Sequence, residues 1–284
     1  MPLFLEVTME PRVRLTALLV VLNGERLLGR CLDSLSFCDR ILIVDSFSTD
    51  ATEQIARDHG AIFIQNKWPG NAKQVQYGLD WLEANAPTDW VLMLDCDEII
   101  SFDLRKSILA ALENPGDKTS FSMPRLTWYF DGFLRHGGCY PDRLFRLFTP
   151  KGVRIENSGA HQKFVPTGPY GELQGDMIHY TYESFRNQLD KLNDYAERGA
   201  RDLEAKGKKG GVMRGLGHGT WRFVDMYFRK LGLLDGRAGF LMAAHTAFYT
   251  FLKYVRIHEG GWGAPFDHCP IDDAPSTNSE SQRG

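Results

Sequence analysis

The first half of the chain alternates short apolar runs with segments in which apolar residues recur at helical spacing. The runs predict strands over residues 15–22, 41–44, 61–65 and 90–94, and the periodic segments predict helices over residues 25–35, 51–59 and 72–84. Strands that alternate with helices are typical of parallel strands joined by crossover helices. The four consecutive apolar residues 91–94 fit a strand that is covered on both faces. The pattern predicts an α/β fold with a doubly wound sheet.

The pattern changes after residue 100. It predicts a helix over 103–113, a turn over 114–117, extended segments over 120–130 and 143–148, and an irregular segment over 152–171 that is rich in turn formers. Residues 182–201 are strongly helical, and residues 221–256 again have a helix-like composition. We therefore expect an α/β domain over residues 1–180 and a helical region over residues 181–266. Within that region, residues 204–220 are predicted to be a flexible basic loop, and residues 267–284 a disordered tail.

Composition narrows the class of protein. A formal net charge of −3 gives no reason to expect a nucleic-acid partner. The five cysteines are scattered without the spacing of a zinc site or a disulfide framework, which favours a reducing compartment. Residues 1–14 lack the apolar core of a secretory signal, and no stretch approaches the roughly 20 apolar residues that span a bilayer. We expect a cytoplasmic protein and leave open a peripheral place on the inner face of the cytoplasmic membrane.

Polar clusters follow three of the predicted strands: Asn23, Gly24 and Glu25 after the first, residues 45–50 after the second, and residues 95–98 after the fourth. In a doubly wound sheet, ligands bind beyond the carboxyl ends of the strands, so these clusters are expected to converge. Asp95 and Asp97, one residue apart at a strand end, suit a hard divalent cation that shares its coordination with substrate phosphates. A metal-bound diphosphate is the predicted ligand, although such carboxylates also cap turns and helices. Asp45 is the better ligand candidate of its cluster, because Ser48, Thr49 and Asp50 are ordinary helix N-caps.

The order and spacing of many short motifs resemble those of one family. The chain resembles family 2 inverting glycosyltransferases, and among them the bacterial lipopolysaccharide-core beta-1,4-glucosyltransferase-like enzymes. The resemblance rests on these motifs: residues 23–25, 44–50, 68–70, 73–74, 94–98, 141–142, 146–148, 161, 179–180, 191, 193, 195–196 and 234–236.

The resemblance implies a glycosyltransferase-A-type fold, mostly parallel in its sheet and with a helical C-terminal extension, that binds a nucleotide diphosphate sugar. The residues implied in the donor site are Asn23, Glu25, Asp45, Lys73, Gln74, Asp95 and Arg146. Asp97 is implied as the main ligand of a Mg or Mn ion, with Asp95 and His161 as further metal ligands. His179 is weighed for the same role and left in second place, and Arg146 is expected to contact the diphosphate or acceptor, or else to pair with a carboxylate.

Inverting transfer also needs a base that takes the proton of the acceptor hydroxyl. Relatives commonly have a His-Glu pair where this chain has His161 and Gln162, and a glutamine amide cannot accept that proton. Asp142 and Glu156 are the nearest carboxylates in sequence and become the candidate bases. A local slip of the motif correspondence ranks second, and weak or lost catalysis ranks third.

The last third interleaves aromatic residues with lysines and arginines, as interfacial helices do, which fits an anionic membrane surface and a lipid-linked or lipopolysaccharide-core acceptor. Packing of these helices on one another is the alternative.

The preferred hypothesis is therefore a metal-dependent inverting glycosyltransferase that moves a hexose. A catalytically silent nucleotide-sugar-binding or scaffold protein is the second hypothesis. A nucleotidyltransferase is the third, and it is disfavoured together with a nicotinamide-dependent oxidoreductase because no glycine-rich phosphate loop follows the first strand.

Overall fold

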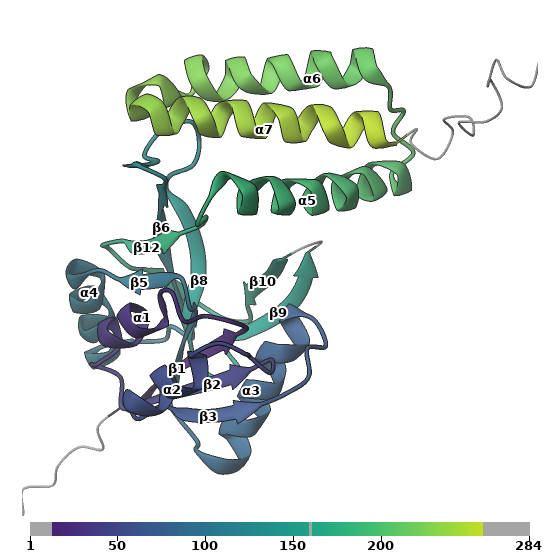
Figure 1. The fold of residues 1–284 in the computed structure, drawn as a ribbon. Coiled ribbons are helices and arrows are strands. Elements are labelled where there is room, and N and C mark those ends of the chain that lie inside the picture. The colour runs from purple at the N-terminus through teal and green to yellow at the C-terminus, as the bar shows by residue number, and fades with distance from the viewer. Residues whose placement is uncertain (1–12, 159–160, 258–284) are drawn as a thin grey trace, which may run out of the picture.

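The computed structural model describes residues 13–158 and 161–257 (Figure 1). The strands are β1 (Leu15–Val21), β2 (Arg40–Asp45), β3 (Ile62–Gln65), β4 (Trp90–Asp95), β5 (Glu98–Ile100), β6 (Ser120–Tyr129), β7 (Gly132–Phe133), β8 (Asp142–Phe148), β9 (Val153–Ser158), β10 (His161–Pro166), β11 (Tyr170–Glu172) and β12 (Met177–Tyr180). The α-helices are α1 (Leu28–Ser34), α2 (Thr52–Asp58), α3 (Asn71–Asn85), α4 (Phe102–Glu113), α5 (Phe185–Ala205), α6 (Val212–Val224) and α7 (Gly236–Arg256). A π-helical turn, η1 (Asp225–Arg229), and a 3-10 turn, η2 (Gly232–Asp235), join α6 to α7.

One large sheet contains ten of the strands that lie between residues 15 and 180. Its strand order is β3-β2-β1-β4-β8-β6-β12-β5, and β11 and β7 pair with β6. The four strands from β3 to β4 are parallel to one another, whereas β8 is antiparallel to both β4 and β6. β12 runs parallel to β6 and antiparallel to β5. The expected α/β class with a mostly parallel sheet and a helical C-terminal extension is confirmed.

The central strands are mostly apolar, which fits a sheet whose two faces are both covered by helices. On β1, Leu15, Ala17 and Leu19 enter a core formed with α1, α4 and neighbouring strands. Leu18 of the same strand points to the opposite face, where a second core contains α3 residues such as Val75. This alternation follows from the period of two in a strand, and it requires continuous apolar sequence in strands buried on both sides.

The segment predicted to be irregular, residues 152–171, forms strands instead. β9 and β10 pair antiparallel in a separate two-stranded sheet, and β11 joins β6. Strands as short as these show only a weak alternation of apolar and polar residues. The turn-forming residues that flank them therefore led to the prediction of an irregular segment.

The helical extension forms a layer apart from the sheet in which α6 lies alongside α7 and α5 lies on their sheet-facing side (Figure 1). The prediction of a loop over 204–220 is wrong for its second half, because α6 begins at Val212. Two of the glycines that suggested a loop, Gly215 and Gly219, lie on the packing face of this helix. A Cβ added to Gly215 would lie 2.9 Å from the Phe251 carbonyl oxygen of α7, and one added to Gly219 would lie 3.0 Å from that of Ala247.

Two predictions lie outside the described residues. These are the disordered tail over 267–284 and, except for residues 13 and 14, the absence of a secretory signal at the N-terminus. Among the residues that the structure describes, no helix has both the length and the apolar character needed to cross a bilayer.

Close packing of α6 on α7 predicts opposite effects for two glycines of one helix. Gly217 has nothing within 4 Å of an added Cβ, so Gly217→Ala should raise the free energy of unfolding by about 1 kcal/mol through helix propensity. Gly215→Ala should lower it by about 1–3 kcal/mol, because the added methyl meets a backbone oxygen that cannot move aside. Urea unfolding followed by circular dichroism measures both, and equal effects at the two positions would contradict the close packing.

Candidate active site

The polar clusters meet because the strands that carry them end at the same edge of the sheet. Val21 at the end of β1 is in register with Asp45 of β2, and the preceding Val20 is in register with Asp95 of β4. Since neighbouring strands are about 4.8 Å apart, the backbones of Asp45 and Asp95 lie about 10 Å from each other. The convergence expected from the sequence is thus present in the register.

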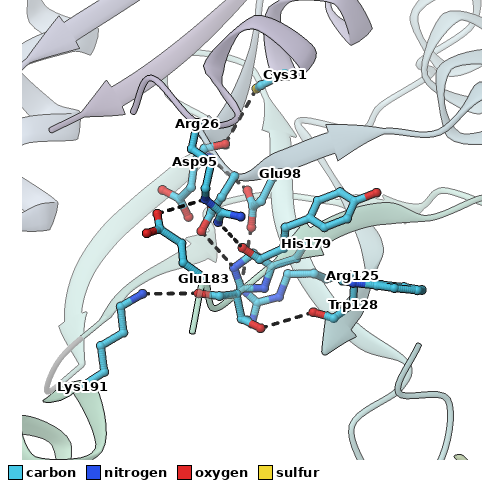
Figure 2. Close-up of polar contacts among 12 residues, drawn as sticks. Arg26, Cys31, Asp95, Glu98, Arg125, Trp128, His179, Glu183 and Lys191 are labelled. Atoms are coloured by element: carbon cyan, nitrogen blue, oxygen red, sulfur yellow. Dashed lines mark hydrogen bonds and ion pairs between the residues drawn. The ribbon is translucent and has the colours of Figure 1, made fainter. Parts of the chain in front are cut away.

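A buried arginine organises the end of β4. Arg146 of β8 donates from Nη2 to Oδ2 of Asp95 at 2.7 Å and to Oε1 of Glu98 at 3.0 Å. The other oxygen of Glu98, Oε2, accepts from the backbone N–H of Asp95 at 3.0 Å, and Arg125 Nη1 lies 3.6 Å from Glu98 Oε1. Figure 2 shows Asp95, Glu98 and Arg125 converging beside His179. We call Asp95, Asp97, Glu98 and their partners the acidic edge.

Burial and pairing have opposite effects on these charges. Burial raises the pKa of Glu98 above its ordinary value, although Arg146 works against that rise. Burial would lower the pKa of Arg146, but Glu98 and Asp95 outweigh it and hold that pKa above its ordinary value. Arg146 therefore stays charged, and its guanidinium is already paired with two carboxylates. Arg146 was expected either to contact the diphosphate or acceptor or to pair with a carboxylate, and in the structure it pairs with carboxylates.

Asp97 is oriented differently from its two acidic neighbours. Its Oδ2 lies 3.6 Å from Nε2 of His179, which belongs to β12. The pairing of strands accounts for this approach, because His179 is in register with Glu98 of β5 and the N–H of Tyr180 donates to the Asp97 carbonyl at 3.0 Å. His179, left in second place in the sequence analysis, is thus the histidine that the structure places beside the Asp-x-Asp motif.

The helical extension also acts on Asp97. Burial alone would raise the pKa of Asp97, yet that pKa lies below its ordinary value because the His179 imidazole and the Lys191 ammonium of α5 stabilise the carboxylate. Lys191, labelled in Figure 2, donates from Nζ to the Thr181 carbonyl at 3.4 Å, and its Nζ lies 5.3 Å from the centroid of the Tyr182 ring. Tyr195, one turn further along α5, is close enough for Asp97 to contribute to its raised pKa, although burial is the larger cause. Lys191 and Tyr195 belong to the motifs of the resemblance, but the sequence assigned neither of them a role.

Cys96, between the two aspartates, is a neutral thiol. Its burial, with the charges of Asp97 and Asp95 beside it, raises its pKa to about 12. In the absence of a bound metal ion, this thiol therefore keeps its proton at neutral pH.

The expected donor residues that follow β1 and β2 form hydrogen bonds between and within the two loops that carry them. Oδ1 of Asn23 accepts from the Thr49 N–H at 2.9 Å, and Oε2 of Glu25 accepts from the Ala51 N–H at 3.0 Å. Asp45 is fully buried and accepts from the Ser48 N–H at 2.9 Å as well as from the Ser48 hydroxyl. These side chains shape the edge of the sheet, and direct contact of each with a nucleoside stays a prediction.

Two further expected donor residues lie on the first turn of α3. Gln74 is buried and joins the strand ends, since its Nε2 donates to the Ser46 hydroxyl and to the Asn66 carbonyl, both at 3.1 Å. Lys73 next to it is exposed. Of the two, Lys73 has its side chain available to a ligand.

The two candidate bases lie in different surroundings. Asp142, at the start of β8, accepts from Arg125 Nε at 3.0 Å and from Nη2 at 2.6 Å, both on its Oδ2, and Arg125 in turn reaches Glu98 of the acidic edge. Glu156 lies on β9 in the separate two-stranded sheet and pairs with Arg154 on the surface. The structure therefore connects Asp142, but not Glu156, to the acidic edge through a shared arginine.

His161 and Gln162 begin β10, but their side chains are outside the described part of the structure. The assignment of His161 to the metal therefore stays a prediction. Two surface hollows of about 440 and 510 Å³ lie elsewhere, the first beside Phe145 and Tyr170 and the second beside α3. Because neither is lined by Asp95 or Asp97, we place the candidate site by its chemistry and by the register of the strands.

Asp97 and His179 have the chemistry of a divalent-cation site. Their facing atoms are too far apart for a hydrogen bond, and Nδ1 of His179 is buried without a hydrogen-bond partner among the described residues. No group of three His, Cys, Asp or Glu side chains within residues 13–158 and 161–257 is arranged to hold a metal alone. Mg²⁺ commonly takes one or two protein ligands and completes its shell with water and substrate phosphates, so two residues suffice. Asp95 is bound to Arg146 and is less free to serve than was expected.

Comparison with known proteins identifies the class. Residues 16–159 match the family described as "Glycosyl transferase family 2", which covers half of the chain, so this protein belongs to glycosyl transferase family 2. It is an enzyme of the glycosyltransferase class, as the resemblance implied.

Two relatives found by sequence agree with that class. The chain is 27% identical over 258 residues to the lipopolysaccharide core biosynthesis glycosyltransferase LpsC of Rhizobium meliloti, covering 88% of this chain and 94% of that protein. It is 26% identical to an uncharacterized glycosyltransferase of Rickettsia typhi, covering 87% of each. Among solved structures, a glucosyl-3-phosphoglycerate synthase from Mycobacterium tuberculosis, crystallised with Mn2+, UDP and glucosyl-3-phosphoglycerate, aligns with a TM-score of 0.44 at 18% identity, covering 70% of this chain and 82% of that one.

The role of Arg146 in the acidic edge predicts a large loss of stability when it is removed. Arg146→Leu leaves Glu98 and Asp95 without their shared cation, so the free energy of unfolding should fall by about 3 kcal/mol. Arg154→Leu is the matched control, because its pair with Glu156 is exposed to solvent and should leave the stability nearly unchanged. Chemical denaturation of the two variants measures the difference. Equal stability of both variants would show that the buried pairs do not hold the end of β4.

Proposed function

We propose that this protein is a metal-dependent inverting glycosyltransferase that moves a hexose from a nucleotide diphosphate sugar to a lipopolysaccharide-core or other lipid-linked glycan acceptor. Membership of the family supports the transfer, and the named function of the Rhizobium relative supports the acceptor class. The observation that carries the proposal is the pair of Asp97 and His179 at the end of the parallel strands. The sheet directs the donor to that edge, and the pair supplies two ligands for a cation on its diphosphate.

The chain's own residues would act on the donor in two ways. Asp97 stays ionised because its pKa is lowered, so it binds a cation without first losing a proton. Lys191 adds a positive charge from α5, on the same side as Asp97, which favours a diphosphate placed between them. A bound Mg or Mn ion would act as a Lewis acid that stabilises the charge of the departing diphosphate.

Inversion requires a carboxylate on the acceptor side, and we assign this role to Asp142. Two hydrogen bonds from Arg125 fix the Asp142 carboxylate through one oxygen, and the side chain remains partly exposed. The acceptor hydroxyl would donate its proton to that carboxylate while its oxygen attacks the sugar carbon. The hydrogen bonds from Arg125 fix this base in place, and positioning contributes much of the rate in such reactions.

Loss of the Asp97 carboxylate should remove metal-dependent donor binding. Asp97→Asn should weaken the Mn-dependent binding of a nucleotide diphosphate sugar by at least about tenfold, because a neutral amide oxygen is a poor ligand for a hard cation. Thermal shift with a panel of nucleotide sugars, with and without Mn, measures this loss. Asp58→Asn, an exposed carboxylate at the end of α2, is the control and should bind as the wild type does. Unchanged donor affinity in Asp97→Asn would exclude the proposed metal site.

Transfer assays separate the two candidate bases. Asp142→Asn should reduce transfer to the acceptor by about 100-fold or more while Mn-dependent donor binding remains, because the variant lacks the group that accepts the proton. Glu156→Gln should keep most of the transfer activity, since its side chain pairs with Arg154 in another sheet. The reverse result would move the base to β9. Donor binding without turnover in the wild type would favour the silent nucleotide-sugar-binding protein instead.

A further inference from the structure

The connection between α6 and α7 exposes a cluster of large apolar side chains. We call residues 221–240, which comprise the end of α6, the turns η1 and η2 and the start of α7, the tip. Its exposed apolar residues are Trp221, Val224, Phe228, Leu231, Leu233, Leu234 and Phe240. Single exposed apolar residues are common on protein surfaces, whereas seven within twenty residues mark an interaction surface.

The rings of the tip pack mainly on one another. Phe223 lies 5.3 Å from Tyr227 and 5.8 Å from Phe240, and Tyr227 lies 5.1 Å from Phe228, measured between ring centroids. At the turn between η1 and η2, Leu231 has a φ of 60° and is half exposed. A branched side chain in the left-handed region is strained, and here the strained residue presents its side chain outward.

All exposed charges of the tip are positive. The segment contains four basic residues, Arg222, Arg229, Lys230 and Arg237, and each has an exposed side chain. Its two acidic side chains, Asp225 and Asp235, are 7% and 4% exposed. Arg222, Arg229 and Lys230 pair with Asp225, and Arg237 pairs with Asp131. The four basic and two acidic residues give the tip a formal net charge of +2, although the whole chain carries a net charge of −3.

The tip is fixed to the α/β domain by the connection between β7 and β8. The backbone N–H of His136 donates to Asp235 Oδ2 at 2.7 Å, and its Nδ1 lies 2.6 Å from Oδ1 of the same carboxylate. The N–H of Gly137 donates to the Lys230 carbonyl at 2.8 Å, and Arg237 pairs with Asp131 just before β7. Figure 1 shows this connection reaching the end of the layer formed by α6 and α7. A surface held by the tip would thus be held at a set orientation to the sheet.

We propose that the tip is a docking surface for an anionic lipid bilayer, into which Trp221, Phe228 and Leu234 insert at the level of the headgroups. Aromatic and branched apolar residues flanked by arginines and lysines fit the boundary between headgroups and acyl chains. Two copies of the tip facing each other would bring together surfaces of the same charge, so charge complementarity favours an anionic bilayer over a second copy of this chain. This inference names a surface and a partner, and it does not depend on the donor chemistry.

Vesicle binding tests the apolar part of the surface. The full-length protein should co-sediment with vesicles of phosphatidylcholine that contain phosphatidylglycerol and should bind pure phosphatidylcholine more weakly. Trp221→Ser with Leu234→Ser should weaken binding at least about tenfold, because each removes an inserted apolar side chain. Phe102→Ser with Leu109→Ser removes two exposed apolar side chains from α4 and is the matched control, with binding unchanged.

A second pair of variants tests the charges. Arg229→Gln with Arg237→Gln should lower the preference for anionic vesicles by about fivefold for each charge removed, and added salt should reduce that preference further. Arg57→Gln with Arg201→Gln, on exposed faces of α2 and α5, should leave the preference unchanged.

Tryptophan fluorescence locates the contact. Lipids brominated near the headgroup should quench the wild-type protein, and Trp221→Phe should bind as well as the wild type but lose most of the quenching. Donor binding, measured separately, should be the same in all tip variants, so a failure of the proposed function and a failure of the docking surface can be told apart.

Three results would overturn the proposal. They are an absence of binding to anionic vesicles at low salt, binding that the tip variants and the α4 control change equally, and a wild-type dimer in sedimentation that Trp221→Ser with Leu234→Ser converts to monomer. The last result would assign the tip to an interface between copies of this chain.

Discussion

The acidic edge depends on one buried cation. Asp95 and Glu98 lie within hydrogen-bonding distance of the same nitrogen of Arg146, and Glu98 is fully buried. At such a short distance, two carboxylates would repel each other, and this repulsion would favour their protonated forms. Their negative charges therefore need a positive partner in the interior. Arg146 provides it from β8, which is the strand that turns the parallel half of the sheet into a mixed one. Because Asp95 and Glu98 are both paired with Arg146, Asp97 is the carboxylate of the motif that instead lies beside His179.

The site is assembled from distant parts of the chain. β4 supplies Asp95 and the turn that carries Asp97, β12 supplies His179, and α5 supplies Lys191, which is remote from Asp97 in sequence. The short strand β12 positions His179 in this assembly, because β12 pairs with β5 on one side and with β6 on the other. The helical extension is consequently part of the electrostatics of the site, as well as a neighbour of the sheet.

The sequence predicted the parallel half of the fold well, because each of its strands is a continuous apolar run that ends in polar residues at a ligand-binding edge. The same pattern pointed to Asp95 and Asp97 as candidate metal ligands, and that assignment stays a prediction. The sequence also raised Arg146 as a possible partner of a carboxylate and His179 as a second-place metal ligand, but it could not say which side chains these two residues meet. Arg146 and His179 come to the acidic edge through β8 and β12, whose register depends on antiparallel pairings that no local pattern encodes. The glycines of α6 led to a wrong prediction for a related reason. From the sequence alone, a glycine that allows two helices to approach closely cannot be told apart from a glycine that allows a loop to bend.

The hydrogen bonds from His136 and Gly137 to the segment between α6 and α7 have a geometric consequence. A protein held on a bilayer through that segment would keep its reacting groups at a constant height above the lipid. In the lipid-linked acceptor proposed above, the sugars are attached to the lipid by a chain of definite length, so such a height would work as a ruler. The enzyme would then choose its acceptor residue partly by its distance from the membrane, in addition to the shape of the sugar itself.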